Sequence, residues 1–342
     1  MALQISPKQH RFWGVAWEHQ LKSRSVIVAG PTAVGKTDLS ILLAQRLGGE
    51  IINADSMQVY RGMNIGTAKP SAQEVHASGV RFHLIDVVAP DEPFTVSAWC
   101  QLANAAVADV FSRSGIPVLC GGTGMYLRSF VQNWSLAETP RNDEIREQLN
   151  REATLLGSQH LHQQLAAVDP EAAARLHQND KLRIVRALEV FLASGVSLSE
   201  HHRRDREGAD LTDQTPIFVI NTDRETLYQR INQRVDLMMS SGLEDEVSSL
   251  LSAGYEDFLP SMRGLGYKEI CAYFRGETTR SEASEQIKLN TRRYAKRQLT
   301  WFRGESNTHW IDLSIRSIAQ AVEAIQAYVD TGVFPDTSAS TV

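Results

Sequence analysis

The sequence predicts an α/β fold in which helices cover both faces of a parallel sheet and an all-helical subdomain is inserted into the chain. Three observations lead to this prediction. Apolar, strand-like runs alternate with helical segments through the first third of the chain. The motif Gly-Pro-Thr-Ala-Val-Gly-Lys-Thr at residues 30–37 follows the first of these runs and opens a helix. Residues 138–205 read as helical and contain no strand-like run.

The expected strands are short and almost continuously apolar, which is typical of a sheet buried on both faces. They comprise residues 26–29, 50–55, 82–87, 116–120, 217–221 and 310–313. Ligands of such sheets bind at the carboxyl ends of the strands. The strand ends at which a site is expected are therefore Gly30, Asp55, Asp86 and Gly121.

Helical patterns fill the segments between the strands. In the core they cover residues 38–47, 97–114, 224–239, 244–252 and 281–302. Two more core helices are expected, one that begins near residue 125 and another that ends near residue 328. In the insertion they cover residues 141–156, 160–168, 171–176 and 180–193.

This order divides the chain into a core domain of residues 25–137 and 206–330 and an insertion domain of residues 138–205. Residues 1–24 contain the acidic Glu18 and no apolar core region, so a loose N-terminal extension is favoured over a targeting peptide. Residues 331–342 are expected to form a disordered tail.

The composition excludes several classes of protein. The 342 residues are 42% hydrophobic and no apolar run approaches the length of a membrane span, so no membrane association is expected. The three cysteines are scattered, which argues against a disulfide framework or a zinc site and suits a cytoplasmic protein. The net charge of −5 does not by itself indicate a nucleic-acid partner, and nothing in the sequence demands more than a monomer.

Residues 30–37 form a complete phosphate-binding loop, or P-loop, which makes the expected core P-loop NTPase-like. Backbone N–H groups of such a loop surround phosphate oxygens at the N-terminus of a helix. The residues that form this cradle are Gly30, Thr32, Ala33, Val34 and Gly35. Lys36 contributes a positive charge, and the Thr37 hydroxyl is the expected ligand of Mg²⁺. The motif therefore predicts binding of a di- or triphosphate with Mg²⁺ as cofactor.

Carboxylates end the second and third expected strands. Asp55 could accept a proton from an attacking group or cap a helix, and its position leaves both roles open. Asp86 has the place of a carboxylate that holds Mg²⁺ through water. Short apolar runs that end in aspartate are common, so the pattern favours a structural role for Asp86 and leaves the magnesium role open.

A second glycine-rich strand end, Gly-Gly-Thr-Gly at residues 121–124, opens another helix. Its glycines permit close approach of the backbone, and Thr123 can hydrogen-bond a phosphate oxygen or a substrate base. Because this loop is expected in the same sheet as the P-loop, a role in the site is favoured over a purely structural turn.

Basic residues cluster on one late helix. Between residues 287 and 304 there is no acidic residue, and the basic ones are Lys288, Arg292, Arg293, Lys296, Arg297 and Arg303. A face of one sign exceeds what solvation of a helix requires, so it indicates binding of a polyphosphate or a nucleic-acid backbone. Arg230 and Arg234 share a face of another helix, where the pattern alone favours surface charges.

Taken in order, these segments closely resemble the tRNA dimethylallyltransferases, also called tRNA isopentenylpyrophosphate transferases, over about residues 24–315. The most specific match is Ile-Gly-Thr-Ala-Lys-Pro at residues 65–70. The other matches are the P-loop, Asp55-Ser56-x-Gln58-x-Tyr60, Gly121-Gly122-Thr123-Gly124-x-Tyr126-Leu127, Asn179-Asp180-x-x-Arg183-x-x-Arg186-Ala187-Leu188-Glu189-Val190, Arg230-Ile231-x-x-Arg234-Val235 and Lys296-Arg297-Gln298-x-x-Trp301-Phe302-Arg303.

Few features depart from the family pattern. Val34 stands in place of the usual serine, and Leu182 stands where a basic or polar residue that contacts tRNA is frequent. The zinc finger of the eukaryotic members is not present in the sequence, so a bacterial-type enzyme is expected.

The resemblance implies that N6 of adenosine 37 in a tRNA anticodon loop attacks C1 of dimethylallyl diphosphate, and that pyrophosphate leaves. The P-loop with Lys36, Mg²⁺ held by Thr37, and Arg234 would bind the diphosphate. Asp55 would take the N6 proton, and Thr123 would hydrogen-bond at the junction of base and diphosphate. The implied tRNA contacts are Asp55, Ser56, Met57, Gln58, Thr123, Arg146, Arg183, Arg186, Arg263, Lys268, Lys296 and Arg297.

Three other functions remain as alternatives. A P-loop kinase of a small molecule would use Asp55 to deprotonate an alcohol. A prenyltransferase acting on free adenine nucleotides would use the same chemistry without tRNA. An RNA-binding module without catalysis would leave Lys36, Thr37 and Asp55 unexplained.

Overall fold

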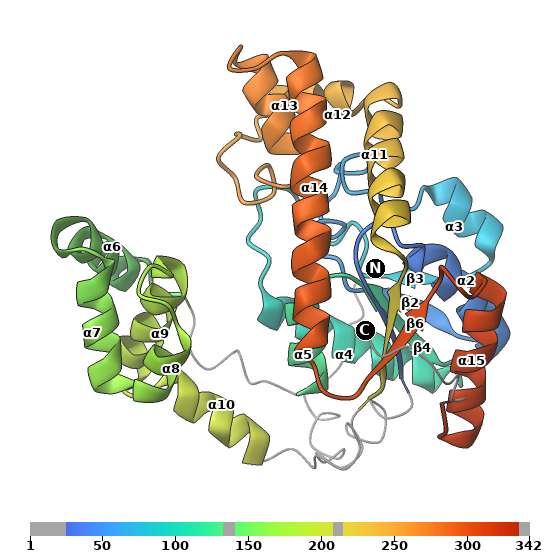
Figure 1. The fold of residues 1–342 in the computed structure, drawn as a ribbon, viewed down its shortest axis with the longest axis horizontal. Coiled ribbons are helices and arrows are strands. Elements are labelled where there is room, and N and C mark those ends of the chain that lie inside the picture. Colours follow the sequence, from blue (N-terminus) through green and yellow to red (C-terminus); the bar gives the residue numbers. More distant parts are fainter. Residues whose placement is uncertain (1–24, 133–140, 208–214, 335–342) are drawn as a thin grey trace. The chain divides into compact units, whose positions relative to one another are not determined.

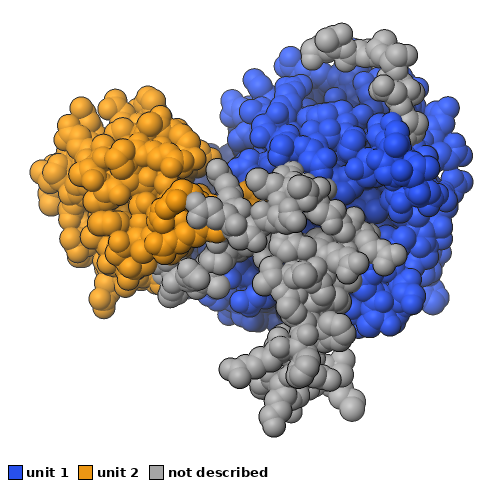
Figure 2. All heavy atoms as spheres, turned by 90° about the horizontal axis from the view of Figure 1, so that it is seen from below, with its two compact units in different colours: residues 1–131, 213–342 blue, residues 132–212 orange. Residues whose placement is uncertain are grey.

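The structure of the protein is a computed structural model, which describes residues 25–132, 141–207 and 215–334 (Figure 1). The described residues fall into two compact units. Unit 1 contains the described residues of the segments 1–131 and 213–342, and unit 2 those of the segment 132–212 (Figure 2). The expected N-terminal extension of residues 1–24 lies outside the described residues. Of the expected tail only residues 331–334 are described, and Thr331 is still helical.

Unit 1 contains a six-stranded parallel sheet with the strand order β3-β2-β4-β1-β5-β6. The strands are β1 (Val26–Ala29), β2 (Glu50–Asn53), β3 (Phe82–His83), β4 (Pro117–Gly121), β5 (Ile217–Asn221) and β6 (Thr308–Asp312). Strand β1 pairs with β4 and β5, so the loop that follows it opens in the interior of the carboxyl edge. The predicted α/β class with a parallel sheet is confirmed.

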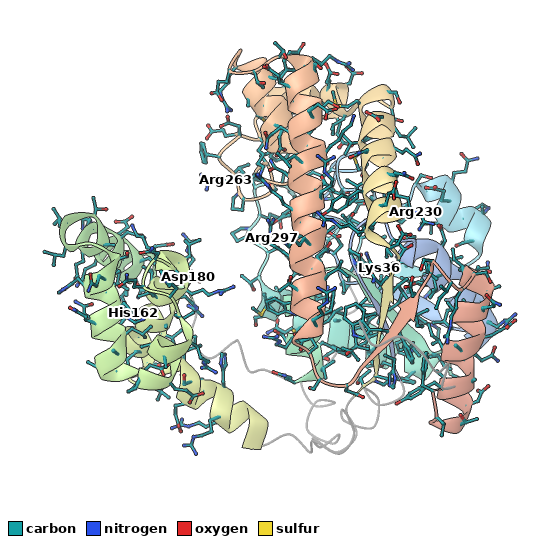
Figure 3. All side chains as sticks on the ribbon, in the orientation of Figure 1. Lys36, His162, Asp180, Arg230, Arg263 and Arg297 are labelled. Carbon is teal, nitrogen blue, oxygen red and sulfur yellow. The ribbon has the colours of Figure 1, made fainter. Side chains whose placement is uncertain are left out.

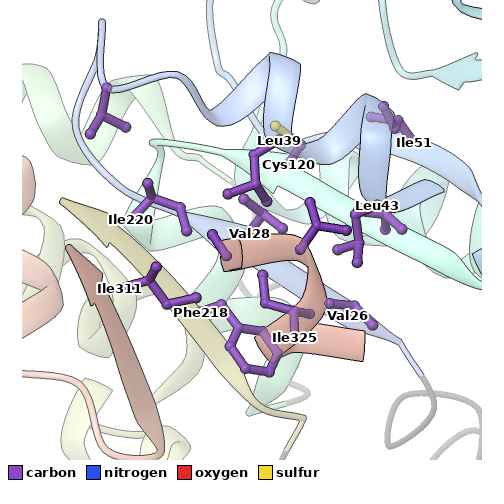
Figure 4. Packing of buried hydrophobic residues seen from close by; sticks show 14 of the residues in the cluster. Val26, Val28, Leu39, Leu43, Ile51, Cys120, Phe218, Ile220, Ile311 and Ile325 are labelled. Carbon is purple, nitrogen blue, oxygen red and sulfur yellow. The ribbon is translucent and has the colours of Figure 1, made fainter. Parts of the chain in front are cut away.

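Helices cover both faces of this sheet. Those of unit 1 are α2 (Lys36–Leu47), α3 (Ala72–Ser78), α4 (Val96–Ser112), α5 (Gly124–Val131), α11 (Arg224–Ser240), α12 (Leu243–Ser252), α13 (Tyr267–Phe274), α14 (Arg280–Arg303) and α15 (Ile318–Thr331). Successive residues of β1 enter different buried clusters, because side chains of a strand alternate between the two faces. Val28 meets Leu43 of α2 and Ile325 of α15 in one cluster (Figure 4). Ile27 lies in the other cluster with the fully buried Trp99 of α4.

A third buried cluster belongs to the helices beyond the sheet. Helices α11 and α14 lie side by side (Figure 1), and α12 and α13 pack with them. Apolar side chains from all four helices meet in this cluster, including Met239, Leu243, Ile270 and Ile287. The long helix α14 is therefore buried along one side, and its other side is left for polar residues.

The described part of unit 2 consists of helices joined by short loops. Its helices are α6 (Asp143–Leu156), α7 (Ser158–Val168), α8 (Pro170–Arg175), α9 (Lys181–Ser194) and α10 (Leu198–Glu207). The fully buried Leu161, Leu165 and Ile184 lie at the centre of its own apolar cluster. The chain enters this unit after α5 and returns to the sheet at β5, so the helices interrupt the sheet-forming order, as predicted for an inserted subdomain.

The structure differs from the sequence-based prediction in a few elements. The third strand covers two residues, Phe82–His83, because Leu84 and Asp86 adopt left-handed φ angles of 62° and 55° that end the extended backbone. Helices α3, α10 and α13 were not anticipated. Helix α3 buries no residue, so it shows no apolar stripe, and the capping box of Ser71 and Glu74 was its available signal.

Candidate active site

The P-loop connects β1 to α2 through unusual backbone conformations. Gly30 and Gly35 have φ angles of 144° and 102°, which side-chain-bearing residues rarely adopt, and Ala33 has a φ of 65°. A Cβ atom at Gly30 would lie 2.4 Å from the carbonyl oxygen of Ile220 in the neighbouring strand β5. Glycine is therefore required at position 30 by both conformation and space. Of the five cradle residues, Thr32 has its backbone N–H already bonded to a side chain, the Oε1 of Gln298, at 2.9 Å.

Lys36 is held inside the P-loop. Its Nζ donates a hydrogen bond of 2.7 Å to the carbonyl oxygen of Pro31. Burial lowers the pKa of the Lys36 ammonium group to about 8, although the nearby Cys120 thiol and the Asp55 carboxylate raise it, and Arg234 lowers it further. A desolvated ammonium group with a single hydrogen bond to the described residues can bind an anion strongly.

Both arginines of α11 face the P-loop region. The Arg230 guanidinium donates to the carbonyl oxygen of Val34 at 3.3 Å, and Figure 3 shows Arg230 and Lys36 in the same part of unit 1. Burial lowers the pKa of Arg234, while Asp38 and Asp55 raise it. Arg234 is therefore an inward-facing cation beside Lys36. The surface-charge interpretation that the pattern favoured is wrong for Arg234.

Asp55 follows β2 and occupies a turn, with no helix after it to cap. Its Oδ1 accepts a hydrogen bond of 2.8 Å from the backbone N–H of Met57. Its Oδ2 has no hydrogen-bond partner among the residues that the structure describes. Because Asp55 acts on the pKa of both Lys36 and Arg234, the carboxylate lies close to the two cations of the phosphate site. The helix-cap interpretation is excluded, and one carboxylate oxygen is available to a substrate.

Thr123 is joined to the loop that carries Asp55. Its Oγ1 accepts from the backbone N–H of Ser56 at 3.0 Å and lies 3.3 Å from the Ser56 hydroxyl. Its backbone N–H donates to the carbonyl oxygen of Ala54 at 3.2 Å. A Cβ atom at Gly121 would lie 2.1 Å from that same oxygen, so glycine permits this close approach. The carboxyl ends of β1, β2 and β4 therefore bring Lys36, Asp55 and Thr123 together, as predicted for strand ends.

The specific segment 65–70 forms a loop beside this site rather than a part of it. The side-chain amide of Gln58 donates to the carbonyl oxygens of Thr67 and Ala68 at 3.1 and 3.2 Å. The almost fully buried Lys69 forms an ion pair of 2.6 Å with Asp86. Asp86 thus has a structural partner, which the sequence favoured over a role in holding Mg²⁺. Met57 lies against Gly264, where a Cβ atom would be 2.4 Å from the Met57 methyl group.

Glu246 of α12 holds the start of that loop, and sequence reasoning missed it. Its carboxylate accepts backbone hydrogen bonds from Asn64, Ile65 and Gly66 at 2.9, 2.8 and 3.1 Å. It also accepts a 2.7 Å bond from the Tyr267 hydroxyl. A carboxylate that binds consecutive backbone N–H groups fixes a loop strongly. The sequence around Glu246 reads as an ordinary acidic helix start and offers no signal for this role.

We expect Glu246→Ala to lower the free energy of unfolding by about 2 kcal/mol, because it leaves three backbone donors and the Tyr267 hydroxyl without their acceptor. Urea denaturation followed by circular dichroism measures the change. Glu244→Ala is the matched control in the same helix. Among the described residues Glu244 forms an ion pair with the exposed Arg280 alone, so it should contribute less than about 1 kcal/mol. Equal losses of unfolding free energy in the two variants would contradict the role of Glu246 in holding this loop.

The basic helix α14 divides into two parts. Lys288 forms ion pairs of 2.7 Å with Asp236 and 2.9 Å with Glu285, and Arg292 donates to the Asn232 side chain at 2.6 Å. These two cations pack α14 on α11, so the prediction of one continuous basic row is wrong for them. Those that stay exposed on α14 are Arg293, Lys296, Arg297 and Arg303. Arg263 and Lys268 are also exposed, and Figure 3 shows Arg263 and Arg297 on this part of unit 1.

In unit 2 the expected tRNA contacts gather around a buried carboxylate. Glu189 is fully buried, and its Oε2 lies 2.9 Å from both the Arg146 and the Arg186 guanidinium groups. Burial raises the pKa of Glu189, but hydrogen bonds from Arg146, Arg186 and the Asn142 backbone hold it below its usual value. Arg183 is exposed and forms an ion pair of 3.2 Å with Asp180, which caps the same helix. Arg146 and Arg186 thus have a structural role in unit 2, where they neutralise the buried Glu189.

Comparison with known proteins identifies the family. Residues 58–305 match the family model described as IPP transferase. A tRNA dimethylallyltransferase from Desulforudis audaxviator is 50% identical over 289 residues, which cover 84% of this chain and 91% of that protein. The chain belongs to the IPP transferase family.

Solved structures of related proteins agree with the fold of this IPP transferase. The tRNA isopentenylpyrophosphate transferase of Bacillus halodurans matches it with a TM-score of 0.66 at 38% identity, over 90% of this chain and 97% of that one. A eukaryotic dimethylallyltransferase, in a structure described as acting on tRNA, matches with a TM-score of 0.75 at 25% identity over 91% and 81% of the two chains. The family match begins at residue 58, so the roles of the P-loop and Asp55 depend on their motif and geometry.

Few residues of this IPP transferase are suited to bind Mg²⁺, and in a phosphate site few are needed. Mg²⁺ in phosphate sites is bound by one or two protein oxygens together with phosphates and waters. The exposed Thr37 hydroxyl at the start of α2 is such an oxygen, and it makes no hydrogen bond to the described residues. Across those residues no group of three or more His, Cys, Asp or Glu could hold a metal ion. None of the described helices has the length and apolar character needed to cross a membrane.

Proposed function

We propose that this IPP transferase transfers a dimethylallyl group from dimethylallyl diphosphate to N6 of adenosine 37 in the anticodon loop of tRNA. The observation that supports it most is the grouping of Lys36, Arg234, Asp55 and Thr123 at one edge of the sheet. This grouping combines two cations for a diphosphate with a carboxylate and a hydroxyl for a base. The names of its relatives give the same transferred group, dimethylallyl, and tRNA as the molecule acted on.

The diphosphate of the donor occupies the P-loop in this proposal. Lys36 and Arg234 face it from two elements, and the N-terminus of α2 adds its partial positive charge. As the bond from C1 to oxygen breaks, its electron pair passes to the diphosphate, and the two cations stabilise the growing negative charge. Mg²⁺, held by Thr37 and phosphate oxygens when bound, would supply further charge neutralisation.

The acceptor amine is positioned by Asp55 and Thr123. The N6 lone pair of adenine forms the new bond to C1, and the N6 proton passes to Asp55 Oδ2, the oxygen left available by the turn at Met57. Thr123, oriented by its bond from Ser56, hydrogen-bonds the base beside the diphosphate. An amine conjugated to a purine is a weak nucleophile, so positioning supplies much of the rate.

The tRNA is bound through its phosphates and by extrusion of the target base. The exposed cations of α14, with Arg263 and Lys268, supply positive charges in unit 1 that can contact phosphates. Ser56, Met57 and Gln58 directly follow Asp55 in the chain, so we expect them to contact the flipped base or its neighbours. In unit 2, Arg183 is the more exposed of the three expected contacts, and Arg146 and Arg186 retain partial exposure beside Glu189.

Transfer of radiolabel from dimethylallyl diphosphate tests this function, with bulk tRNA, AMP and ATP as parallel acceptors. Label in tRNA is expected, and a transcript without adenosine at position 37 should receive none. Label found only in AMP or ATP would instead establish a prenyltransferase of free nucleotides. Consumption of ATP with no label in any acceptor would establish a nucleotide-hydrolysing or kinase function.

We expect Lys296→Ala to weaken tRNA binding similarly for all substrate tRNAs and to reduce the salt dependence of binding by about one phosphate contact. Lys296 is exposed on α14 and has no ionic partner among the described residues, so its charge is available to a phosphate. Filter binding between low and moderate salt measures the slope. Lys288→Ala serves as the comparison, because that lysine is paired with Asp236 and should leave the slope unchanged. An unchanged slope in Lys296→Ala would remove this face of α14 from the interface.

A further inference from the structure

One side of α14 reaches into both loops of the proposed active site. Tyr294, Gln298 and Trp301 follow one another at spacings of four and three residues, so they share a face of the helix. Gln298 is the most buried of the three polar side chains, with 6% of its surface exposed. Such a buried amide needs partners for both its oxygen and its nitrogen.

The Gln298 amide uses both of its ends to connect the two loops. Its Oε1 accepts from the backbone N–H of Thr32 in the P-loop at 2.9 Å. Its Nε2 donates to the carbonyl oxygen of Gly122 in the second glycine-rich loop, also at 2.9 Å. A Cβ atom at Gly122 would lie 2.1 Å from that nitrogen and 3.1 Å from the carbonyl oxygen of Gly30. Glycine at position 122 therefore lets the amide and both loops meet at one point.

Residues of α14 on either side of Gln298 also pack against the second glycine-rich loop. The Trp301 ring fills the space beside Gly124, where a Cβ atom would lie 2.2 Å from the ring. The Arg128 guanidinium lies 4.2 Å from the centre of that ring and pairs with Glu305 beyond the end of the helix. Burial raises the pKa of the Tyr294 hydroxyl, and the Asp55 carboxylate and Thr123 lie near enough to influence it. The position of Gln298 is thus fixed on both sides along the helix.

We infer that Gln298 is a positioning residue for prenyl transfer, which holds the P-loop and the Thr123 loop at a fixed separation so that donor diphosphate and acceptor base meet in register. This inference rests on the proposed function. Gln298 reaches neither reacting atom in this account, since both of its polar atoms are occupied by backbone groups. Its effect passes through the Thr32 and Gly122 backbones. A displacement of about 1 Å between reacting groups can lower the rate by about 100-fold.

The test compares Gln298→Met, which keeps the length of the side chain but neither hydrogen bond, with Gln298→Glu. We expect Gln298→Met to lower kcat/KM for dimethylallyl diphosphate by about 100-fold, through both kcat and KM. The Kd for tRNA should stay within about twofold, because the exposed cations on the other side of α14 are unchanged. A kcat/KM within threefold of wild type in the folded variant would overturn the inference.

The Gln298→Glu variant keeps the test decisive if Gln298→Met does not fold. A protonated carboxyl group carries one donor and one acceptor, as the amide does, whereas the ionised carboxylate has no donor for Gly122. Burial favours the protonated form. The activity of Gln298→Glu relative to wild type should therefore rise several-fold as the pH is lowered from 8 to 6. A ratio that does not change with pH would overturn the bridging role. The control is Gln101→Glu on the exposed face of α4, whose ratio should stay constant.

Binding of inorganic pyrophosphate to the enzyme, measured by calorimetry, separates this inference from the proposed function. If wild type prenylates no tRNA but Gln298→Met still weakens pyrophosphate binding at least tenfold, the bridge is correct and the proposed reaction is wrong. If wild type prenylates tRNA and Gln298→Met binds pyrophosphate and turns over normally, the reaction is correct and the bridge is wrong.

Discussion

Asp55→Asn is expected to lower kcat for prenyl transfer by about 10³-fold, within the range that removal of a general base causes. The asparagine Oδ1 can still accept the bond from the Met57 backbone N–H, so the turn after β2 is preserved. What the variant removes is the negative oxygen Oδ2, which takes the N6 proton in the proposed reaction. Label transfer from dimethylallyl diphosphate to tRNA measures the loss.

The Asp55→Ala variant separates the base from the turn. It removes the acceptor for the Met57 N–H as well, so it should lose activity to the same extent and also lower the free energy of unfolding by about 1 kcal/mol. In both variants the affinity for tRNA should fall far less than the rate, because the phosphate contacts of α14 are untouched. An Asp55→Asn enzyme that keeps a tenth of the wild-type rate would exclude Asp55 as the base.

Lys36→Met is expected to lower kcat/KM for dimethylallyl diphosphate by about 10³-fold, since it removes a buried cation from the site of the leaving group. In the wild-type enzyme, raising the pH should have the same effect as the substitution, because deprotonation of Lys36 also removes its positive charge. The pKa of Lys36 lies at about 8, so the free enzyme loses this charge above pH 8. We expect kcat/KM to fall with pH above that value. Lys36→Arg, which stays charged, should be a weaker enzyme whose decline is shifted to higher pH.

Lys36→Met should also raise the free energy of unfolding of the ligand-free protein. The pKa of Lys36 is about 8 in the folded protein and 10.5 for an ordinary lysine, so at pH 7 the folded state carries a buried charge at a cost of up to about 3 kcal/mol. Between pH 8 and 10.5 the unfolded chain binds more protons, and the stability of wild type rises with pH. The advantage of Lys36→Met over wild type is therefore fully present below pH 8 and disappears toward pH 10.5. Urea titrations at pH 7 and pH 10 measure it; equal stabilities at pH 7 would show that Lys36 carries no such cost.

Local patterns predicted the strands and the residues at their ends. Apolar runs, glycine positions and the P-loop motif describe conformations that depend on neighbours in the chain. The parallel order then brings the ends of β1, β2 and β4 to one edge, so Lys36, Asp55 and Thr123 could be grouped before any contact was known. The sequence left the role of Asp55 undecided, because a carboxylate after a strand serves equally well as a helix cap or a proton acceptor.

The partners of charged and polar side chains were beyond the sequence. Lys288 and Arg292 looked like members of a basic row, yet α11 supplies Asp236 and Asn232 beside them. Arg234 looked like a surface charge until the packing of α11 turned it toward Asp55. The sequence does not show whether a charged side chain faces solvent, a carboxylate or a phosphate. The packing of the helices determines which of these it contacts.

By itself the sequence determined the α/β class, the P-loop and the family-like motifs, because each of these depends on residues close together in the chain. The tertiary structure alone decided that Glu246 holds the loop at Asn64 and that Gln298 joins Thr32 to Gly122. Glu246 and Asn64 are 182 positions apart along the chain, and Gln298 is 266 positions from Thr32 and 176 from Gly122. Contacts at such separations leave no periodic pattern in a single sequence, since they form only when whole helices pack on the completed sheet.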